Sequence, residues 1–284
     1  MRVLGSRRWG AVAAVPVAAL FVGSLTPGAE ASSPAARTTT VFVVHDRAIT
    51  EDSGLAQAGR FFVTTNDNGS SATVYTLNQR GRTVGTTNWA RRQHDCEAIA
   101  PINAGHVWIG DIGDNDAVRS SILVSKVPVG RGDRTVRPKK YHLVYPDGPH
   151  NAETLLRDPT TGALYIVTKS PTGGTLYAVP KPLSAAHANQ LVPIAPVPLA
   201  KATDGAFFAS GNYLVIRDYD RALLYAWPSM TQMGTFRLPT QPQGEGLATD
   251  TGGSVFLSTE GVRQPVLHYR LPAKLRRILK TPPE

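Results

Sequence analysis

The sequence contains one cysteine, Cys96, among 284 residues. A single cysteine cannot form an intrachain disulfide, and it excludes zinc sites that are built from several cysteines. Charged residues are scarce at 18%, and aromatic residues make up only 7%. The sequence also lacks a Gly-x-Ser-x-Gly element, a phosphate-binding glycine loop and a zinc-binding motif. Local motifs therefore do not indicate a serine hydrolase of that type, a P-loop nucleotidase or a zinc enzyme.

Long hydrophobic runs are missing from residue 32 onward, and the one apolar run before it spans residues 11–25. Three arginines precede this run, and Ala29-Glu30-Ala31 follows it as a small-x-small cleavage site. This arrangement predicts a secretory signal peptide over residues 1–31. The triplet Ser6-Arg7-Arg8 leaves the twin-arginine route open beside the general one. We therefore expect a secreted, extracellular protein without a membrane span.

Net charge is the next feature, and it changes when the leader is removed. The whole sequence has a formal net charge of +9, and loss of residues 1–31 removes three arginines and one glutamate, which leaves +7. The remaining excess is concentrated at residues 131–140 and 274–280. A solvated loop and tail explain these clusters, as does attraction to an anionic cell-wall polymer. No basic motif interleaved with aromatic residues predicts specific binding of nucleic acid.

Glycine and proline are plentiful, and they separate short apolar segments that recur along the chain. Five segments share one order: a short strand, a turn, an apolar strand that ends in a polar residue, a Gly/Asn/Asp loop and a third strand. Successive segments start 44, 56, 51 and 41 residues apart. Repeats of about 40–50 residues with four short strands each are typical of β-propeller blades. The segments start at Ser53, Glu97, Glu153, Asp204 and Glu245.

The sequence thus predicts an all-β fold, a single β-propeller with five blades of four antiparallel strands. A degenerate sixth blade could lie within residues 125–150 or 180–202, and a β-sandwich is the alternative fold. Residues 41–44 should supply the fourth strand of the fifth blade and so close the ring without a free sheet edge. We divide the chain into the signal peptide (1–31), a linker (32–40), the propeller (41–271) and a basic C-terminal tail (272–284).

Polar residues stand at equivalent places in the five repeats. In a propeller the inner strand of each blade lines the central channel and runs antiparallel to its neighbour, so the start of the first strand and the end of the second share one mouth. Seven of these ten places hold carboxylates and one holds a lysine. The sequence therefore predicts an acidic channel mouth. The starts are the five residues named above, and the ends are Asn66, Asp111, Lys169, Asp218 and Glu260.

Carboxylates crowded at one mouth repel each other, so some must be protonated or a cation must lie among them. Surroundings that are rich in oxygen and poor in histidine suit Ca²⁺. Ion pairing is the alternative, for Glu153 with Lys169 and for Asp204 with Arg217. Aspartates of the adjoining loops, such as Asp67 and Asp114, also suit the capping of turns. The predicted calcium ligands are Glu97, Asp111, Glu153, Asp204, Asp218, Glu245 and Glu260.

Two histidines precede these carboxylates in a shared pattern, His94-Asp95-Cys96-Glu97 and His150-Asn151-Ala152-Glu153. A histidine beside a carboxylate can act as a general base near neutral pH, so His94 and His150 are candidate bases, although loop histidines also bond to backbone. The candidate ligand-binding residues are Asn66, Lys169 and Arg217. Lys169 could bind an anionic group or neutralise Glu153. Cys96 is best explained as a small buried packing residue.

Several of these motifs resemble a group of secreted bacterial propellers described as TolB-like or phytase-like (esterase-like), over roughly residues 45–270. In that group the place of Cys96 is typically aromatic, which supports a packing function. The segments 245–248 and 256–260 are similar to phytase-type and regucalcin-type propellers, which implies bound calcium and hydrolysis by channel-mouth carboxylates. The phosphate-binding cluster of phytases has only Lys169 and Arg217 as counterparts here. The motifs are Glu51-Asp52-Ser53-Gly54-Leu55-Ala56, Asn66-Asp67-Asn68-Gly69, Gly110-Asp111-Ile112-Gly113-Asp114-Asn115 and Tyr145-Pro146-Asp147-Gly148.

Three functions follow as hypotheses, since propellers serve many. The first is a secreted, monomeric binding module that holds a small polar or anionic molecule, or a cell-surface polymer, at a calcium-bearing mouth. The second is a calcium-dependent hydrolase, phytase-like or lactonase-like. The third is a scaffold for protein contacts.

Overall fold

The computed structural model describes residues 37–67, 72–89 and 93–283. The chain divides after Ser32, and the described residues belong to the second unit, Ser33–Glu284. The predicted signal peptide, residues 1–31, lies outside the described residues.

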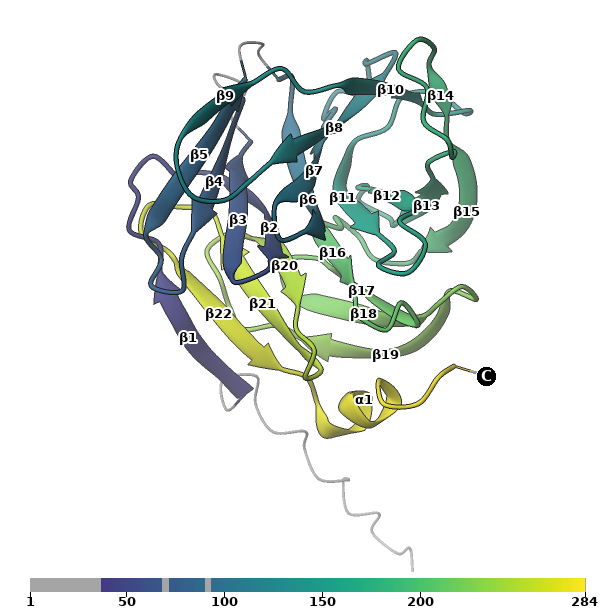
Figure 1. Cartoon of the computed structure of the whole chain (residues 1–284). Helices are drawn as coiled ribbons and strands as arrows, with labels where there is room; N and C mark the ends of the chain where they lie inside the picture. The colour runs from purple at the N-terminus through teal and green to yellow at the C-terminus, as the bar shows by residue number, and fades with distance from the viewer. Residues whose placement is uncertain (1–36, 68–71, 90–92, 284) are drawn as a thin grey trace, which may run out of the picture. The chain divides into compact units, whose positions relative to one another are not determined.

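The second unit is a β-propeller of five sheets, as the repeats predicted (Figure 1). The first strand of each repeat is the innermost strand of a blade, and these five strands follow one another around a closed ring. Strand β2 contacts β6 and β20, and the ring continues from β6 to β11, from β11 to β16 and from β16 to β20. The inner strands are β2 (Asp52–Ala58), β6 (Cys96–Asn103), β11 (Ala152–Arg157), β16 (Asp204–Phe207) and β20 (Gly244–Thr249).

The second and third strands of each blade pair antiparallel in chain order. They are apolar on both faces because each blade packs between two others; every residue of β12, β17 and β4 is buried. The second strands are β3 (Phe61–Asn66), β7 (His106–Asp111), β12 (Leu164–Thr168), β17 (Tyr213–Arg217) and β21 (Ser254–Thr259). The third strands are β4 (Ala72–Leu77), β8 (Ile122–Pro128), β13 (Gly174–Ala178), β18 (Arg221–Ala226) and β22 (Pro265–Arg270).

The fourth strands lie outside the third strands, and the last blade takes its fourth strand from the N-terminal side of the chain. Strand β1 pairs antiparallel with β22, with Thr38 opposite Tyr269 and Val43 opposite Pro265. The predicted closure of the ring is therefore confirmed. The fourth strands are β5 (Thr83–Trp89), β10 (Lys140–Val144), β15 (Val192–Val197), β19 (Thr231–Arg237) and β1 (Thr38–Val43).

The two long stretches that could have hidden a sixth blade form short edge strands instead. Strand β9 (Arg134–Val136) pairs parallel with β5, and β14 (Asn189–Gln190) pairs parallel with β10. Each thus extends the sheet of the preceding blade to five strands. Within the described residues the sheets number five, so the five-bladed alternative is correct.

The C-terminal segment begins with a short helix, α1 (Ala273–Ile278), which packs on β19. Its buried Leu275 lies against Gly234, where an added Cβ would come within 2.6 Å of the leucine side chain. In the part of the chain that the structure describes, no helix has the length and apolar character needed to cross a membrane.

Closure by β1 depends on Phe42, whose ring is buried at 6% exposure and meets the Phe62 ring edge-on at 5.3 Å. We expect Phe42→Ala to lower the free energy of unfolding by about 3–5 kcal/mol, because it removes a buried ring and leaves a cavity. Val43 on the same strand is 41% exposed. Val43→Ala should therefore change stability by less than about 1 kcal/mol. Urea unfolding measures both variants, and equal losses would contradict the proposed closure.

Candidate functional site

The channel mouth is shaped by irregular steps at the start of the inner strands. In β6, Cys96 pairs with Asp111 and Ala98 pairs with Gly110, so Glu97 is an extra residue with no partner opposite. Glu153 is the extra residue of β11 in the same way. The pairing also shifts around Ser53 in β2 and around Glu245 in β20. Such β-bulges re-aim a side chain, and here they coincide with the equivalent mouth positions of four blades.

Asp204 occupies the same position in the fourth blade, where the pairing of β16 with β17 runs without a shift. Its carboxylate is fully buried and accepts backbone N–H bonds from Gly205 at 2.7 Å and from Leu247 at 2.6 Å. Burial raises its pKa well above the ordinary value, although these backbone bonds and Arg217 oppose the rise. Asp204 therefore joins neighbouring inner strands beneath the mouth.

Arg217 is fully buried beside this carboxylate and also binds backbone. Its Nη1 donates to the Gly246 carbonyl at 3.1 Å, and its Nε donates to the Asp218 carbonyl at 3.0 Å. Burial lowers its pKa to about 10, and Asp204 opposes this shift. Both members of the expected Asp204–Arg217 pair thus lie inside the protein, but among the described residues no hydrogen bond or ion pair joins the two side chains, and each binds backbone groups instead.

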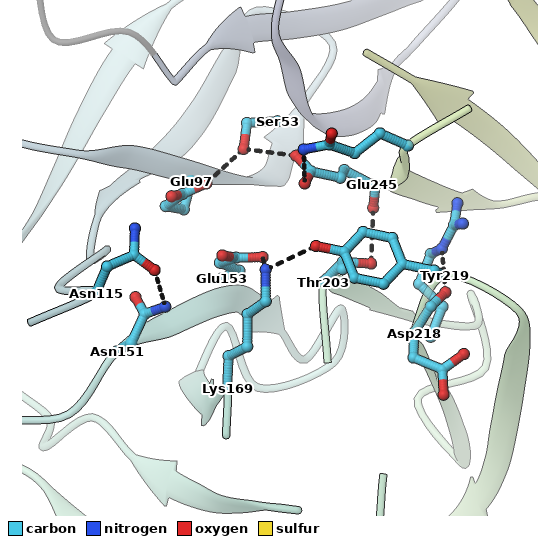
Figure 2. Close-up of polar contacts among 12 residues, drawn as sticks. Ser53, Glu97, Asn115, Asn151, Glu153, Lys169, Thr203, Asp218, Tyr219 and Glu245 are labelled. Atoms are coloured by element: carbon cyan, nitrogen blue, oxygen red, sulfur yellow. Dashed lines mark hydrogen bonds and ion pairs between the residues drawn. The ribbon is translucent and has the colours of Figure 1, made fainter. Parts of the chain in front are cut away.

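Three polar side chains meet at the side of the mouth formed by β2, β6 and β20 (Figure 2). The Ser53 hydroxyl lies 2.5 Å from Glu97 Oε2 and 3.3 Å from Glu245 Oε2. A hydroxyl has one proton to donate. Burial, followed by repulsion from Glu153, raises the pKa of Glu97 well above its ordinary value. The Ser53 hydroxyl thus links the two carboxyl groups while donating to only one of them at a time.

Lys169 reaches into the mouth from the end of β12 (Figure 2). Its ammonium lies 2.5 Å from Glu153 Oε2 and donates to the Tyr219 hydroxyl at 3.0 Å. Burial lowers the pKa of Lys169, but the Glu153 carboxylate raises it further, and the net shift is upward. Burial also raises the pKa of Glu153 to about 7, against the opposing effect of Lys169. The expected ion pair is confirmed, and it keeps Glu153 able to exchange a proton near neutral pH.

Carboxylate oxygens also gather where the loop after β3 meets the start of β6. Ligand atoms of Asp67, Asp95 and Glu97 all lie within 4.8 Å of one another. Burial and then Glu51 raise the pKa of Asp67 to about 6, and burial raises the pKa of Asp95. One oxygen of Glu51, Oε2, is buried without a hydrogen-bond partner in the described part of the chain. The cluster of Asp67, Asp95 and Glu97 can hold a hard cation because it offers several carboxylate oxygens. Its raised pKa values mean that protons bind to these oxygens more readily when no cation is bound.

Glu260 completes the acidic side of the mouth. Gln243 Nε2 donates to Glu260 at 2.8 Å and to Glu245 at 3.2 Å, so one amide spans the two carboxyl groups. Burial and then Glu245 raise the pKa of Glu260 to about 8. Four of the seven predicted metal ligands, Glu97, Glu153, Glu245 and Glu260, therefore lie around one mouth.

The other predicted site residues support local structure. Asp111 pairs with Arg119 at 2.9 Å and accepts the backbone N–H groups of His94 and Asp95. Asp218 accepts the N–H groups of Asp220 and Arg221 in a turn. Asn66 accepts from Thr50 and Glu51 and so fixes the loop that carries Glu51.

The two candidate bases lie apart from the carboxylates that line the channel. His150 Nε2 is 3.1 Å from Asp147, and its ring meets the Tyr145 ring edge-on at 5.0 Å. His94 is exposed and lies in a shallow depression with Asp111 and Arg119. In the described residues, no hydrogen bond joins either imidazole to Glu97 or Glu153. Cys96 is 1% exposed within the core, in keeping with packing.

Glu51, Asp67 and Asp95 are acidic residues of the mouth that were not among the predicted metal ligands. All three stand in motifs that the sequence offered, and Asp67 was interpreted there as suited to capping a turn. Asn68 and Gly69 of the same loop lie outside the described residues. The missing signal was the bulge at Glu97, which turns the side chain toward Asp67 and Asp95 and cannot be read from residue spacing.

Comparison with known proteins establishes the fold. No protein-family model and no curated protein matches the sequence. A glutaminyl cyclase from Myxococcus xanthus is 10% identical, with 81% of this chain and 95% of that chain covered and a TM-score of 0.53. A gluconolactonase from Xanthomonas campestris is 11% identical, with 83% and 89% covered and a TM-score of 0.51. At this identity the similarity shows a shared propeller architecture and no more.

The raised pKa values lead to a prediction for protein stripped of divalent cations. Glu153 and Glu260 have pKa values of about 7 and about 8 against ordinary values of 4.5. Between the ordinary and the raised pKa values, the folded protein keeps protons on Glu153 and Glu260 that the unfolded chain has already released. The stability that these bound protons contribute is lost as the pH rises through the raised pKa values. We expect the free energy of unfolding to fall between about pH 5 and 8.

Urea unfolding at a series of pH values measures this slope. Glu260→Gln should make the slope shallower, whereas Asp220→Asn, in an exposed turn, should leave it unchanged. Parallel curves for Glu260→Gln and the natural protein would show that Glu260 does not bind this proton.

Proposed function

We propose that the channel mouth binds one divalent cation, Ca²⁺ by preference, and a small polar molecule beside it. The approach of Asp67, Asp95 and Glu97 within 4.8 Å carries this proposal. The donor set consists of carboxylate oxygens, which suit a hard cation better than zinc or copper. A bound Ca²⁺ would supply the positive charge that lets these carboxylates ionise together, and it would polarise a nearby carbonyl oxygen.

The rest of the mouth offers groups that would orient the second molecule. Glu153, Lys169 and Tyr219 lie across from Ser53 and Glu97 (Figure 2). The Asn151 side chain donates to Asn115 Oδ1 at 3.0 Å on the neighbouring blade. Among the described residues, the carboxylates of the mouth outnumber its one positive side chain, Lys169. The mouth therefore favours an uncharged hydroxyl-rich molecule, or a molecule with a single anionic group that pairs with Lys169, over a polyanion. A polymer of the cell surface would have to present such a group at its end.

Calcium should raise the melting temperature of the protein and bind with a dissociation constant of about 10⁻⁴–10⁻³ M, the range of extracellular calcium modules. This range agrees with the secretion that the sequence predicts. The variant Asp67→Asn/Asp95→Asn should bind at least about tenfold more weakly, because two ligand charges are lost. Isothermal titration calorimetry of EDTA-treated protein measures this.

The matched control is Asp116→Asn/Asp220→Asn. It removes two exposed aspartates that do not belong to the cluster of Asp67, Asp95 and Glu97. It should bind calcium as the natural protein does. If both double variants bind calcium equally weakly, the loss of affinity is due to net charge and not to these ligands. No binding by the natural protein at millimolar calcium would refute the site.

A second candidate function, hydrolysis of a lactone or ester, is favoured by the pKa of Glu153. With a pKa of about 7, Glu153 can accept a proton from water at neutral pH. The water oxygen would bond to the substrate carbonyl carbon, the carbon–oxygen bond of the ring or ester would break, and the proton would pass to the departing alcohol oxygen. Lys169 would hold Glu153 in place. The acidic mouth favours an uncharged lactone over the phosphate dianion of a phytase substrate.

Glu153→Gln should reduce lactone hydrolysis at least about a hundredfold, since it removes the base but keeps the shape of the side chain. The assay compares simple aldonolactones and aryl esters with an aryl phosphate. Asp147→Asn, which alters the His150 cluster, should retain activity. Loss of activity in Asp147→Asn alone would assign the base to His150, and absence of turnover of any lactone or ester would leave the binding function.

A further inference from the structure

A second cavity opens at the opposite end of the inner strands. It has a volume of about 310 Å³, and all five blades line it. Each blade contributes the end of its inner strand and the turn that follows, so the cavity lies around the channel axis. The turn residues are Gly59, Ala104, Pro159, Ala209 and Thr251.

A layer of apolar side chains separates this cavity from the acidic mouth. It consists of Leu55, Ile99, Leu155 and Leu247, which are each at most 2% exposed. Each stands two residues after the mouth position of its own strand, a rise of about 7 Å along a strand. The same four side chains line this cavity. The two ends of the channel are thus chemically distinct.

The fourth blade lacks the corresponding side chain, and this widens the cavity on that side. Ala206 occupies the position that Leu or Ile fills in the other four blades, and it also lines the cavity. The preceding Gly205 keeps β16 close to β17, since an added Cβ would lie 2.6 Å from the Val215 carbonyl oxygen. Strand β16 therefore stays close to β17, while the small side chain of Ala206 leaves apolar space at this position.

Arg157 gives this hollow a positive charge. It is the last residue of β11, four residues after Glu153, and it lines the cavity. Its guanidinium makes no hydrogen bond or ion pair with other described residues. Asp250 also lines the cavity, but its carboxylate accepts the N–H groups of Gly252 and Ser254 at 2.8 and 2.7 Å and faces His268 Nε2 at 3.2 Å. The guanidinium is therefore available to an anion.

We propose that this cavity binds a small molecule with an apolar body and one carboxylate, such as a medium-chain fatty acid. The apolar layer and Ala206 would contact the body, and Arg157 would bind the carboxylate through paired N–H bonds. Gln57 of β2 also lines the cavity, and its side chain makes no hydrogen bond with the other described residues. The volume lies at the lower end of the range for ligand pockets, which limits the ligand to a small one.

Displacement of anilinonaphthalene sulfonate, a fluorescent apolar anion, tests this proposal with octanoate and octanol as competitors. Octanoate should displace the dye and octanol should do so far more weakly. Arg157→Gln should weaken octanoate binding about tenfold or more, because a charge-assisted pair is lost, and should leave octanol unchanged. Arg80→Gln, at an exposed arginine outside the cavity, is the matched control and should behave as the natural protein.

Ala206→Leu introduces a branched side chain like the Leu or Ile of the other four blades and should weaken displaceable dye binding, because it takes up part of the cavity. Its melting temperature shows whether it folds, and Arg157→Gln provides an independent test if it does not. Asp67→Asn/Asp95→Asn should bind octanoate normally, because its changes lie beyond the apolar layer. Equal displacement by octanoate and octanol, an unchanged affinity in Arg157→Gln, or no displaceable dye in the natural protein would overturn the proposal.

Discussion

Closing five sheets into one ring brings the starts of five inner strands to a common axis, and the rest of the site depends on this constraint. The repeats place an acidic residue at four of the five starts, so ring closure crowds carboxylates that would repel one another in isolation. The structure relieves the crowding with the Lys169–Glu153 pair, and burial raises the pKa values of Glu97 and Glu260 so that these groups hold protons more readily. The stability gained from packing apolar blades holds the acidic groups in place, and a cation can replace the protons they bind.

The five starts do not serve one purpose. Bulges at Glu97, Glu153 and Glu245 turn these carboxylates toward the channel mouth. Asp204 has no bulge and instead binds the amides of neighbouring inner strands, while Arg217 binds their carbonyl groups. One blade thus uses the repeated acidic residue to hold the ring together, and the same blade carries the small Ala206 beside the cavity at the other end. The fourth blade therefore departs from the other four at both ends of its inner strand.

Much of the fold could be predicted from the sequence because it repeats. Strand alternation, turn residues and repeat length gave five blades and closure by the N-terminal strand, since these depend on local patterns and on a ring that must close. The mouth was only partly predictable. Repeat position identified Glu97, Glu153, Glu245 and Glu260, but it could not separate them from Asp204, because a bulge is a pairing shift that leaves no mark on spacing. Asp67 was interpreted as suited to capping a turn, and Asp95 was considered only as part of the histidine motif. The His150 side chain is held by Asp147 and two tyrosine rings from outside its own motif.

We propose above all that the acidic mouth binds a cation. A crystal structure of the mature protein grown with a lanthanide in place of calcium tests this most directly, through the anomalous scattering of the metal. We predict one strong anomalous peak at the mouth, within about 2.3–2.6 Å of carboxylate oxygens from Asp67, Asp95 and Glu97. A mouth without such a peak, with the same carboxyl groups paired through protons at neutral pH, would contradict the account.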